Sequence, residues 1–201
     1  MEHMTLLHRL LYLFKQFELK IGLTNEGVPR SPVTGTARQL VQERCWTGAL
    51  TLAFVAHNAE EALTETHLQG TLLQAYSNNA LTPSEQVMAS MLLSCMALLW
   101  LGVALRARQL TYVSGINTAL AGILLFNALV PHLLLFGILH HYTPGVITVL
   151  LFSIPLGIYQ LVRQRRLGIL TLPLFIKCLW AGLLMGLVSI TLALGLSKLL
   201  V

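Results

Sequence analysis

Long apolar segments with few charged residues dominate this chain, and they limit the folds that it can adopt. Of its 201 residues, 55% are hydrophobic and 10% are charged, whereas a soluble domain carries about 25% charged residues. An apolar stretch of about 20 residues can cross a bilayer as a helix, and a helix satisfies its own backbone hydrogen bonds in lipid. The composition therefore predicts an all-α, polytopic membrane protein.

Five segments have the length and hydropathy of transmembrane helices. They cover residues 46–63, 87–105, 110–136, 146–162 and 172–196. We therefore expect a transmembrane bundle of about five helices over residues 46–201. In the last segment, Gly182 and Gly186 form a GxxxG spacing. This spacing favours close helix packing, either within the bundle or across a homodimer.

The positions of the basic residues predict how this bundle is oriented. Lysine and arginine precede the first span and occupy the second-to-third and fourth-to-fifth connections, at Arg9, Lys15, Lys20, Arg30, Arg38, Arg44, Arg106, Arg108, Arg163, Arg165 and Arg166. The other connections, 64–86 and 137–145, contain neither residue type. The positive-inside rule then places the N-terminus in the cytoplasm and the C-terminus outside. We expect no nucleic-acid binding, which needs a folded basic surface.

Residues 1–45 are expected to form a cytoplasmic region that precedes the bundle. Apolar residues recur there at helical spacing among charged ones, at Leu6, Leu7, Leu10, Leu11, Phe14, Phe17 and Ile21. This pattern predicts an amphipathic helix on the inner leaflet. Docking onto a partner protein is the alternative that fits the same pattern. Glycine and proline in residues 24–36 predict a linker.

A polar group ends the first span, in the sequence His57-Asn58-Ala59-Glu60-Glu61. Residues three and four apart share one face of a helix, so His57, Glu60 and Glu61 are expected to point the same way. An imidazole and two carboxylates at membrane depth are costly unless they are paired, protonated or bound to a cation. The group therefore predicts a divalent metal site or a proton relay.

Polar residues of the third span are expected to reach a similar depth. At 1.5 Å per residue, Asn127 lies about 25 Å above Leu110 and His132 lies about 33 Å above it. Pro131 can kink this helix and turn His132 inward. His140, in the following connection, is a further candidate ligand. Alternatively, it is only a loop residue at the membrane interface.

These residue types suit zinc, iron or manganese as the bound metal. We expect metal ligands among His57, Glu60, Glu61, His132 and His140. A glutamate, Glu60 or Glu61, is expected to serve as general base, and Asn127 is expected to orient a ligand or substrate. A metal-bound water can attack an ester, amide or phosphate, and iron would permit dioxygen chemistry.

Three classes of function remain open at this point. The leading expectation is a metal-dependent membrane hydrolase or oxidoreductase that acts on a lipid or lipid-like molecule in the outer half of the bilayer. A small cation or proton transporter would need a water path from the inside, and the inner halves of the spans look poor in polar groups. A non-catalytic membrane subunit would hold a partner through residues 1–20.

The polar motifs together resemble those of a known family. His57-x-x-Glu60-Glu61, then Asn127 and His132, then Tyr142-Thr143-Pro144-Gly145-x-x-Thr148 are similar to the HXXEE-motif membrane proteins of bacteria. The resemblance covers residues 46–162. It implies a multi-pass protein of the bacterial cytoplasmic (inner) membrane, surrounded by membrane lipids, whose polar motifs form an active site.

The chain resembles the CAAX-protease-like membrane peptidases less closely. Glu60-Glu61 is similar to their paired glutamates, and Phe136-x-x-x-His140 is similar to their second motif. Glu65 stands where their arginine is expected, and no His-x-x-x-Asn sequence follows.

The orientation can be tested with a single cysteine in the connection 64–86. Asn78→Cys, in a chain whose three native cysteines are replaced by serine, is expected to react with an impermeant maleimide added to intact cells, because this connection lies outside. A cysteine at Arg108 should react only after the membrane is ruptured. The reverse labelling pattern would overturn the orientation.

Overall fold

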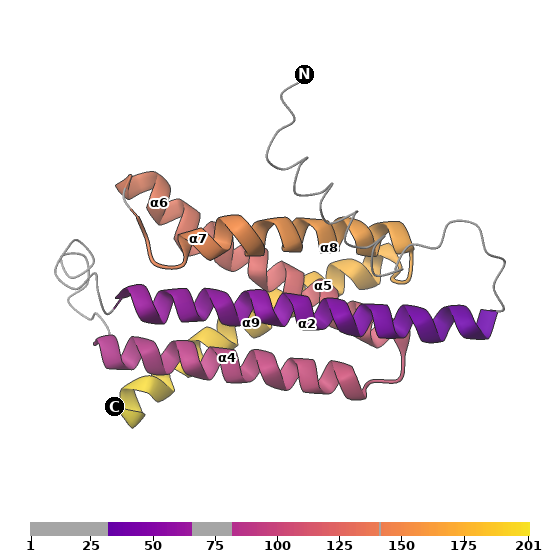
Figure 1. Cartoon of the computed structure of the whole chain (residues 1–201), viewed down its shortest axis with the longest axis horizontal. Coiled ribbons are helices and arrows are strands. Elements are labelled where there is room, and N and C mark those ends of the chain that lie inside the picture. The colour runs from indigo at the N-terminus through magenta and orange to yellow at the C-terminus, as the bar shows by residue number, and fades with distance from the viewer. Residues whose placement is uncertain (1–31, 66–81, 141) are drawn as a thin grey trace, which may run out of the picture.

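The computed structural model describes residues 32–65, 82–140 and 142–201, and every element in them is helical (Figure 1). The expected amphipathic helix in residues 1–23 lies outside these ranges. The first described helix, α2, covers Pro32–Glu65. Residues 32–36, expected to be linker, belong to this helix. Pro32 stands in its first turn, where a proline costs no hydrogen bond. The boundary expected between residues 45 and 46 falls inside α2.

The remaining elements, in chain order, are α4 (Pro83–Arg106), α5 (Leu110–Asn127), η1 (Ala128–Leu133), α6 (Leu134–Leu139), α7 (Val146–Thr148), η2 (Val149–Ser153), α8 (Ile154–Leu167) and α9 (Leu172–Leu200). They form two continuous helices, α4 and α9, and two interrupted ones, α5-η1-α6 and α7-η2-α8. The start of α4 is a capping box, in which Thr82 accepts a hydrogen bond from the Glu85 backbone and the Glu85 side chain accepts one from Thr82. The sequence Thr82-Pro83-Ser84-Glu85 is typical of this motif.

Four helices in the described residues are long and apolar enough to span a membrane. They are Pro83–Arg106, Leu110–Ile138, Val146–Leu167 and Leu172–Leu200, and they match four of the five expected spans. The chain is therefore an all-α, multi-pass membrane protein. The first expected span, residues 46–63, lies in α2 and does not reach the same hydropathy.

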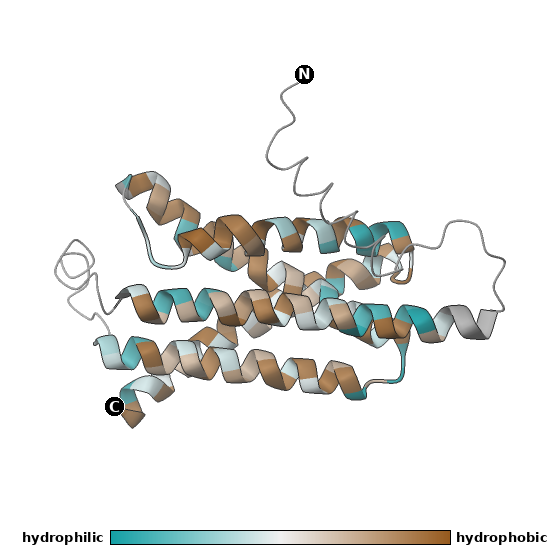
Figure 2. Cartoon of the chain, viewed as in Figure 1, coloured by the Kyte–Doolittle hydropathy of each residue, from teal (hydrophilic) through white to brown (hydrophobic). Residues whose placement is uncertain are grey.

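Polar residues lower the hydropathy of α2, and five of them are buried within the bundle. They are Glu43, Thr47, Thr51, His57 and Asn58. Figure 1 places α2 beside α4, with α8 on its other side. Figure 2 shows hydrophilic residues along much of α2, whereas α4 beside it is largely hydrophobic. A transmembrane role for α2 stays a prediction.

Side-chain contacts near both ends of α2 define how it runs against its neighbours. Glu43 contacts Asn117 and Arg163, while His57 contacts Asn127 and Thr148. Helix α2 is therefore parallel to α5 and antiparallel to α8. Between the two polar ends lies an apolar core cluster, which consists of Trp46, Leu50, Ala53, Ala121, Leu124 and Leu156.

The Glu43 end of the bundle is held by a buried network of charged and polar side chains. Arg163 and Gln164 both donate to the Glu43 carboxylate, and Asn117 donates to it at 2.7 Å. Glu43 itself is only 1% exposed, so its charge must be paired. Of the four residues, only Asn117 lies within an expected span, and the other three stand just outside the expected span boundaries.

The helix Leu110–Ile138 breaks where the sequence places a proline. Val130 has φ −134° and ψ 109°, which is not helical, because a proline disfavours the helical conformation of the residue before it. The expected kink at Pro131 is thus confirmed. The break turns the chain so that His132 is buried.

The GxxxG spacing serves packing inside the bundle. A Cβ atom built on Gly182 would lie 2.5 Å from the backbone oxygen of Ala119 on α5, so only glycine permits this approach of α9 to α5. A Cβ atom on Gly195, farther along α9, meets nothing within 4 Å.

These two glycines give a matched test of the packing. Gly182→Ala is expected to lower the free energy of unfolding by about 1–3 kcal/mol, because the added methyl group forces α5 and α9 apart. Gly195→Ala should be neutral or slightly stabilising. Thermal unfolding in detergent would measure both variants, and equal melting temperatures would contradict this account of the contact.

Candidate metal centre

One group of histidine and carboxylate side chains in the described residues lies close enough together to hold a metal ion: His57, Glu61 and His132. The first two are separated by one turn of α2, and the third follows the break at Pro131. The Nε2 atoms of His57 and His132 lie 3.1 Å apart. The Glu61 Oε1 atom lies 3.2 Å from His132 Nε2 and 3.6 Å from His57 Nε2.

The other ring nitrogen of each histidine already has an oxygen partner. His132 Nδ1 lies 2.9 Å from the carbonyl oxygen of Pro144, which can only accept a hydrogen bond. His57 Nδ1 lies 3.0 Å from Thr148 Oγ1, and that hydroxyl donates to the carbonyl of Gly145. Both Nδ1 atoms are therefore assigned the hydrogen, which leaves a lone pair on each Nε2 atom, and the His57 lone pair faces the Asn127 amide nitrogen at 2.8 Å.

Three electron-rich atoms consequently face one another in a buried space. Two imidazole lone pairs and a carboxylate oxygen repel each other unless a metal ion or a proton lies between them. In a tetrahedral site with bonds of about 2.0–2.1 Å, neighbouring ligand atoms lie about 3.3 Å apart. The separations of 3.1, 3.2 and 3.6 Å are close to this value, so the three residues fit a divalent transition metal.

Asn127 lies beside this group and completes its polar wall. Its Nδ2 atom is 2.8 Å from His57 Nε2. Asn127, expected to orient a ligand or substrate, is thus in contact with the group, and Thr148 is in contact with it from the other side. Asn58, between the motif residues, points to α4 and donates to Ser94 at 3.1 Å.

Glu60 does not join the group, although it was expected to share a face with His57 and Glu61. Its Oε2 accepts a hydrogen bond from the backbone of Thr148 at 2.7 Å, and its Oε1 accepts one from Ile147 at 3.2 Å. Adjacent helical residues point about 100° apart, so the two glutamates diverge. Glu60 instead satisfies backbone groups at the start of α7, which no residue of that helix can satisfy.

Tyr142 strengthens this attachment of the loop to α2. Its hydroxyl donates to Glu60 Oε1 at 2.6 Å. Burial, together with this hydrogen bond, raises the pKa of Tyr142 to about 12, so the hydroxyl keeps its proton at physiological pH. The segment that carries Pro144 and Thr148, the partners of the two histidines, is therefore held in place by Glu60.

His140 also lies outside the group. It ends α6 in the left-handed conformation, with φ 51°, and it is exposed. Its backbone N–H donates to the carbonyl of Phe136. A ligand role for His140 therefore has no support from its position, because the loop turns back toward α2 only after it.

Gly145 is a glycine for two separate reasons. Its φ of 83° is left-handed, and a Cβ atom on it would lie 2.5 Å from His57 Cε1 and 3.1 Å from His132 Cε1. The backbone thus packs directly on both rings. The sequence signal for this contact is the Pro144-Gly145 pair in the loop.

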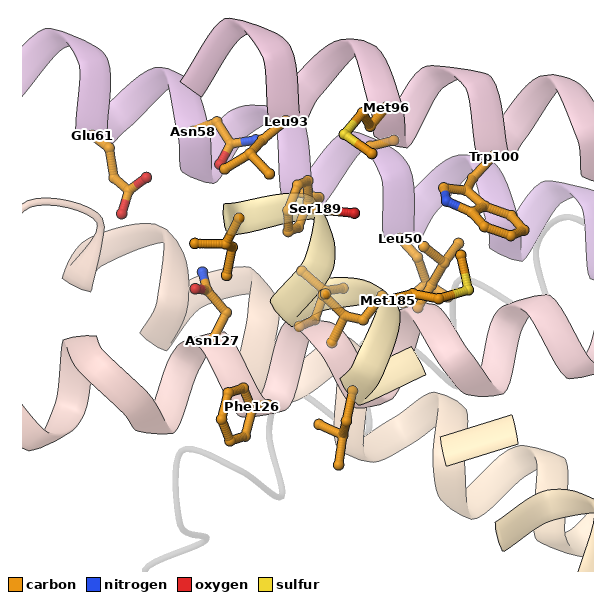
Figure 3. A pocket seen from close by; sticks show the side chains of 18 residues that line it. Leu50, Asn58, Glu61, Leu93, Met96, Trp100, Phe126, Asn127, Met185 and Ser189 are labelled. Atoms are coloured by element: carbon orange, nitrogen blue, oxygen red, sulfur yellow. The ribbon is translucent and has the colours of Figure 1, made fainter. Parts of the chain in front are cut away.

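A narrow crevice between α2, α4, α5 and α9 runs from this group into the bundle (Figure 3). Glu61, Asn58 and Asn127 lie at one end of it, and Trp100, Leu50 and Met185 lie toward the other. Its remaining walls are apolar except for Ser189. The carboxylate of the candidate metal centre is therefore also a wall of an apolar crevice.

Two glycines with left-handed backbones test the contact on the histidines. Gly145→Ala is expected to displace both rings and to reduce metal affinity by at least about 10–100-fold. Gly168→Ala introduces the same kind of backbone strain, of about 1–2 kcal/mol, at φ 63° with nothing within 4 Å. Metal titration of both purified variants separates the effects, and equal affinities would contradict the proposed packing.

Comparison with known proteins identifies a family and nothing closer. No curated protein and no solved structure matches the chain. The resemblance to CAAX-protease-like peptidases gains no support. The match to the family described as "Protein of unknown function with HXXEE motif" covers residues 48–160, which hold the motif on α2, the break at Pro131 and the loop before α7. The chain belongs to this HXXEE-motif family.

Proposed function

We propose that His57, Glu61 and His132 bind a divalent transition metal ion and that the protein is a membrane enzyme which uses this ion. The observation that carries the proposal is the convergence of two imidazole Nε2 atoms and a carboxylate oxygen in a buried space. Two histidines and one glutamate leave at least one coordination position open, as in catalytic zinc and non-haem iron sites. A bound ion of this kind lowers the pKa of water or polarises a substrate carbonyl.

The substrate class follows from the space next to the metal centre. Glu61 and Asn127 belong both to the centre and to the polar end of the crevice. A molecule with a polar head and an apolar body matches this distribution, so the reaction would be hydrolysis or oxidation of a lipid or lipid-like molecule. Asn127 would orient the head.

Glu61 and Glu60 would have different tasks in this enzyme. Glu61 touches both histidines and the crevice, which suits a ligand that can also accept a proton from the reacting group. Glu60 would act as a positioning residue, because it holds the loop whose carbonyl and hydroxyl groups orient the two imidazoles. Such partners tune both ligand geometry and metal affinity.

The interior argues for an enzyme in preference to a transporter. A transported ion would have to pass between the Glu43 network and the metal centre. Buried apolar side chains, among them Leu50, Leu124 and Leu156, occupy the level between them, and such a layer is costly for a charge to cross. In our proposal the centre lies in the outer half of a bacterial inner membrane, with the N-terminus in the cytoplasm.

Elemental analysis of the purified protein tests the metal. The wild-type protein is expected to contain zinc, iron or manganese in stoichiometric amount. His57→Ala, His132→Ala and Glu61→Gln should each lose it, because each removes a donor atom or its charge. His140→Ala is the matched histidine control and should retain the metal, since that residue lies outside the group.

Glu60→Gln separates the two glutamates. This variant should keep the metal but bind it about 10–100-fold more weakly, as expected for a residue that orients ligands without touching the ion. Circular dichroism would verify that all variants keep their helices. Metal-free wild-type protein, or metal loss in His140→Ala equal to that in His132→Ala, would remove the basis of the proposed function.

A further inference from the structure

The crevice beside the metal centre has a polarity that changes along its length. Glu61, Asn58 and Asn127 supply its polar end. Leucine, methionine and aromatic side chains of four helices supply the rest, including Phe54, Leu93, Met96 and Trp100. A uniformly apolar lipid face would show no such polar end, and a solvent-filled cleft would show more polar residues along its walls.

The length of the crevice can be estimated along α2. Glu61 and Leu50 line opposite ends of it on the same helix, so at 1.5 Å per residue it extends about 16 Å. Trp100 lies at the Leu50 end, facing into the crevice beside Met185 (Figure 3). A linear hydrocarbon chain with its head at Glu61 would therefore run along the crevice until it meets the indole.

The walls suit a single flexible chain. Met96 and Met185 contribute unbranched, adaptable side chains on facing helices, and methionine accommodates ligands of variable shape. Gly186 lines the crevice without a side chain, and a Cβ atom on it would meet Ile123 at 3.4 Å. A larger residue at this position would fill the space that a chain needs.

We propose that the crevice binds the acyl chain of a lipid that carries one linear chain, and that Trp100 sets the longest chain accepted. This substrate class deepens the proposed function and rests on it, because the polar head then lies at Glu61 and Asn127. For a probe that enters from water, burial of each methylene strengthens binding about fourfold. Affinity should therefore rise steadily with chain length and stop rising where the chain end reaches Trp100.

Chelator-treated, metal-free protein in amphipol gives a direct test, with monoacylglycerols of increasing chain length as the probes. The readout is the rise in melting temperature at a constant probe concentration, which grows as the dissociation constant falls. The wild-type protein should show a break at one chain length. Trp100→Ala should move this break to longer chains.

Two control variants are available on α9. Trp180→Ala removes an indole that is 64% exposed and lies outside the crevice, so the break should stay where it is. Gly186→Leu should abolish the rise at every chain length, whereas Gly195→Leu, with nothing within 4 Å of its Cβ position, should leave it unchanged.

The outcomes separate this proposal from the metal proposal. A series without a break, a break at the same length in Trp100→Ala, or undiminished binding in Gly186→Leu would each overturn the acyl-chain proposal. A protein that binds chains in this way but never contains metal would contradict the proposed enzyme and support the crevice. A protein that contains metal but shows no break contradicts the crevice alone.

Discussion

The close approach of three electron-rich atoms is the constraint around which one end of this bundle is organised. His57 and His132 direct their Nε2 lone pairs toward each other, Glu61 adds a carboxylate oxygen within 3.6 Å, and the Asn127 amide lies against His57 Nε2. In water such a group would separate, but here the helices, the Pro131 break and the Gly145 backbone hold it together. Packing that holds a carboxylate against two imidazole lone pairs is stabilised by a metal ion or a proton between them. The buried position makes this stabilisation stronger, because solvent does not screen the group.

The two adjacent glutamates show how one helix turn serves two elements at once. Glu61 follows His57 by four residues and shares its face, so both belong to the donor group. Glu60 points instead to the loop before α7, where it accepts hydrogen bonds from Ile147, Thr148 and Tyr142. The loop in turn supplies the acceptors for both Nδ1 atoms. The two acidic positions of the motif therefore have different roles: Glu61 belongs to the donor group, and Glu60 holds the loop that orients the two histidines.

The sequence was sufficient for the features that depend on local pattern. Hydropathy predicted four spans within a few residues, the Thr82 capping box followed from four consecutive residues, and Pro131 predicted the break that buries His132. The depth of Asn127 and His132 along their helix correctly placed them near His57.

The direction in which each side chain points around the helix axis was harder to predict. Spacing alone could not tell that Glu60 belongs to the α7 contact, since the i, i+3 and i, i+4 positions lie on either side of the same face. His140 was expected to be a ligand, but it ends α6 in the left-handed conformation and lies outside the group, and its residue type gives no signal for that turn. The Glu43 network was missed because its partners, Asn117, Arg163 and Gln164, are far apart in sequence and individually resemble boundary residues.

The same network accounts for the unusual composition of α2. A helix that carries Glu43, Thr47, His57 and Glu61 is a poor transmembrane segment by itself, yet its polar groups find partners on α5, η1, α7 and α8 in the folded bundle. Unpaired, these groups would each cost several kcal/mol in hydrocarbon. The stability of α2 as a spanning helix therefore depends on its neighbours more than on its own hydropathy.

A layer that contains Leu50, Leu124 and Leu156 separates the two polar ends of the bundle. The Glu43 end holds three helices together, and the His57 end holds the donor group beside an apolar crevice. The apolar layer between the two ends opposes passage of a charge, which supports the proposed reaction on a molecule taken from the bilayer.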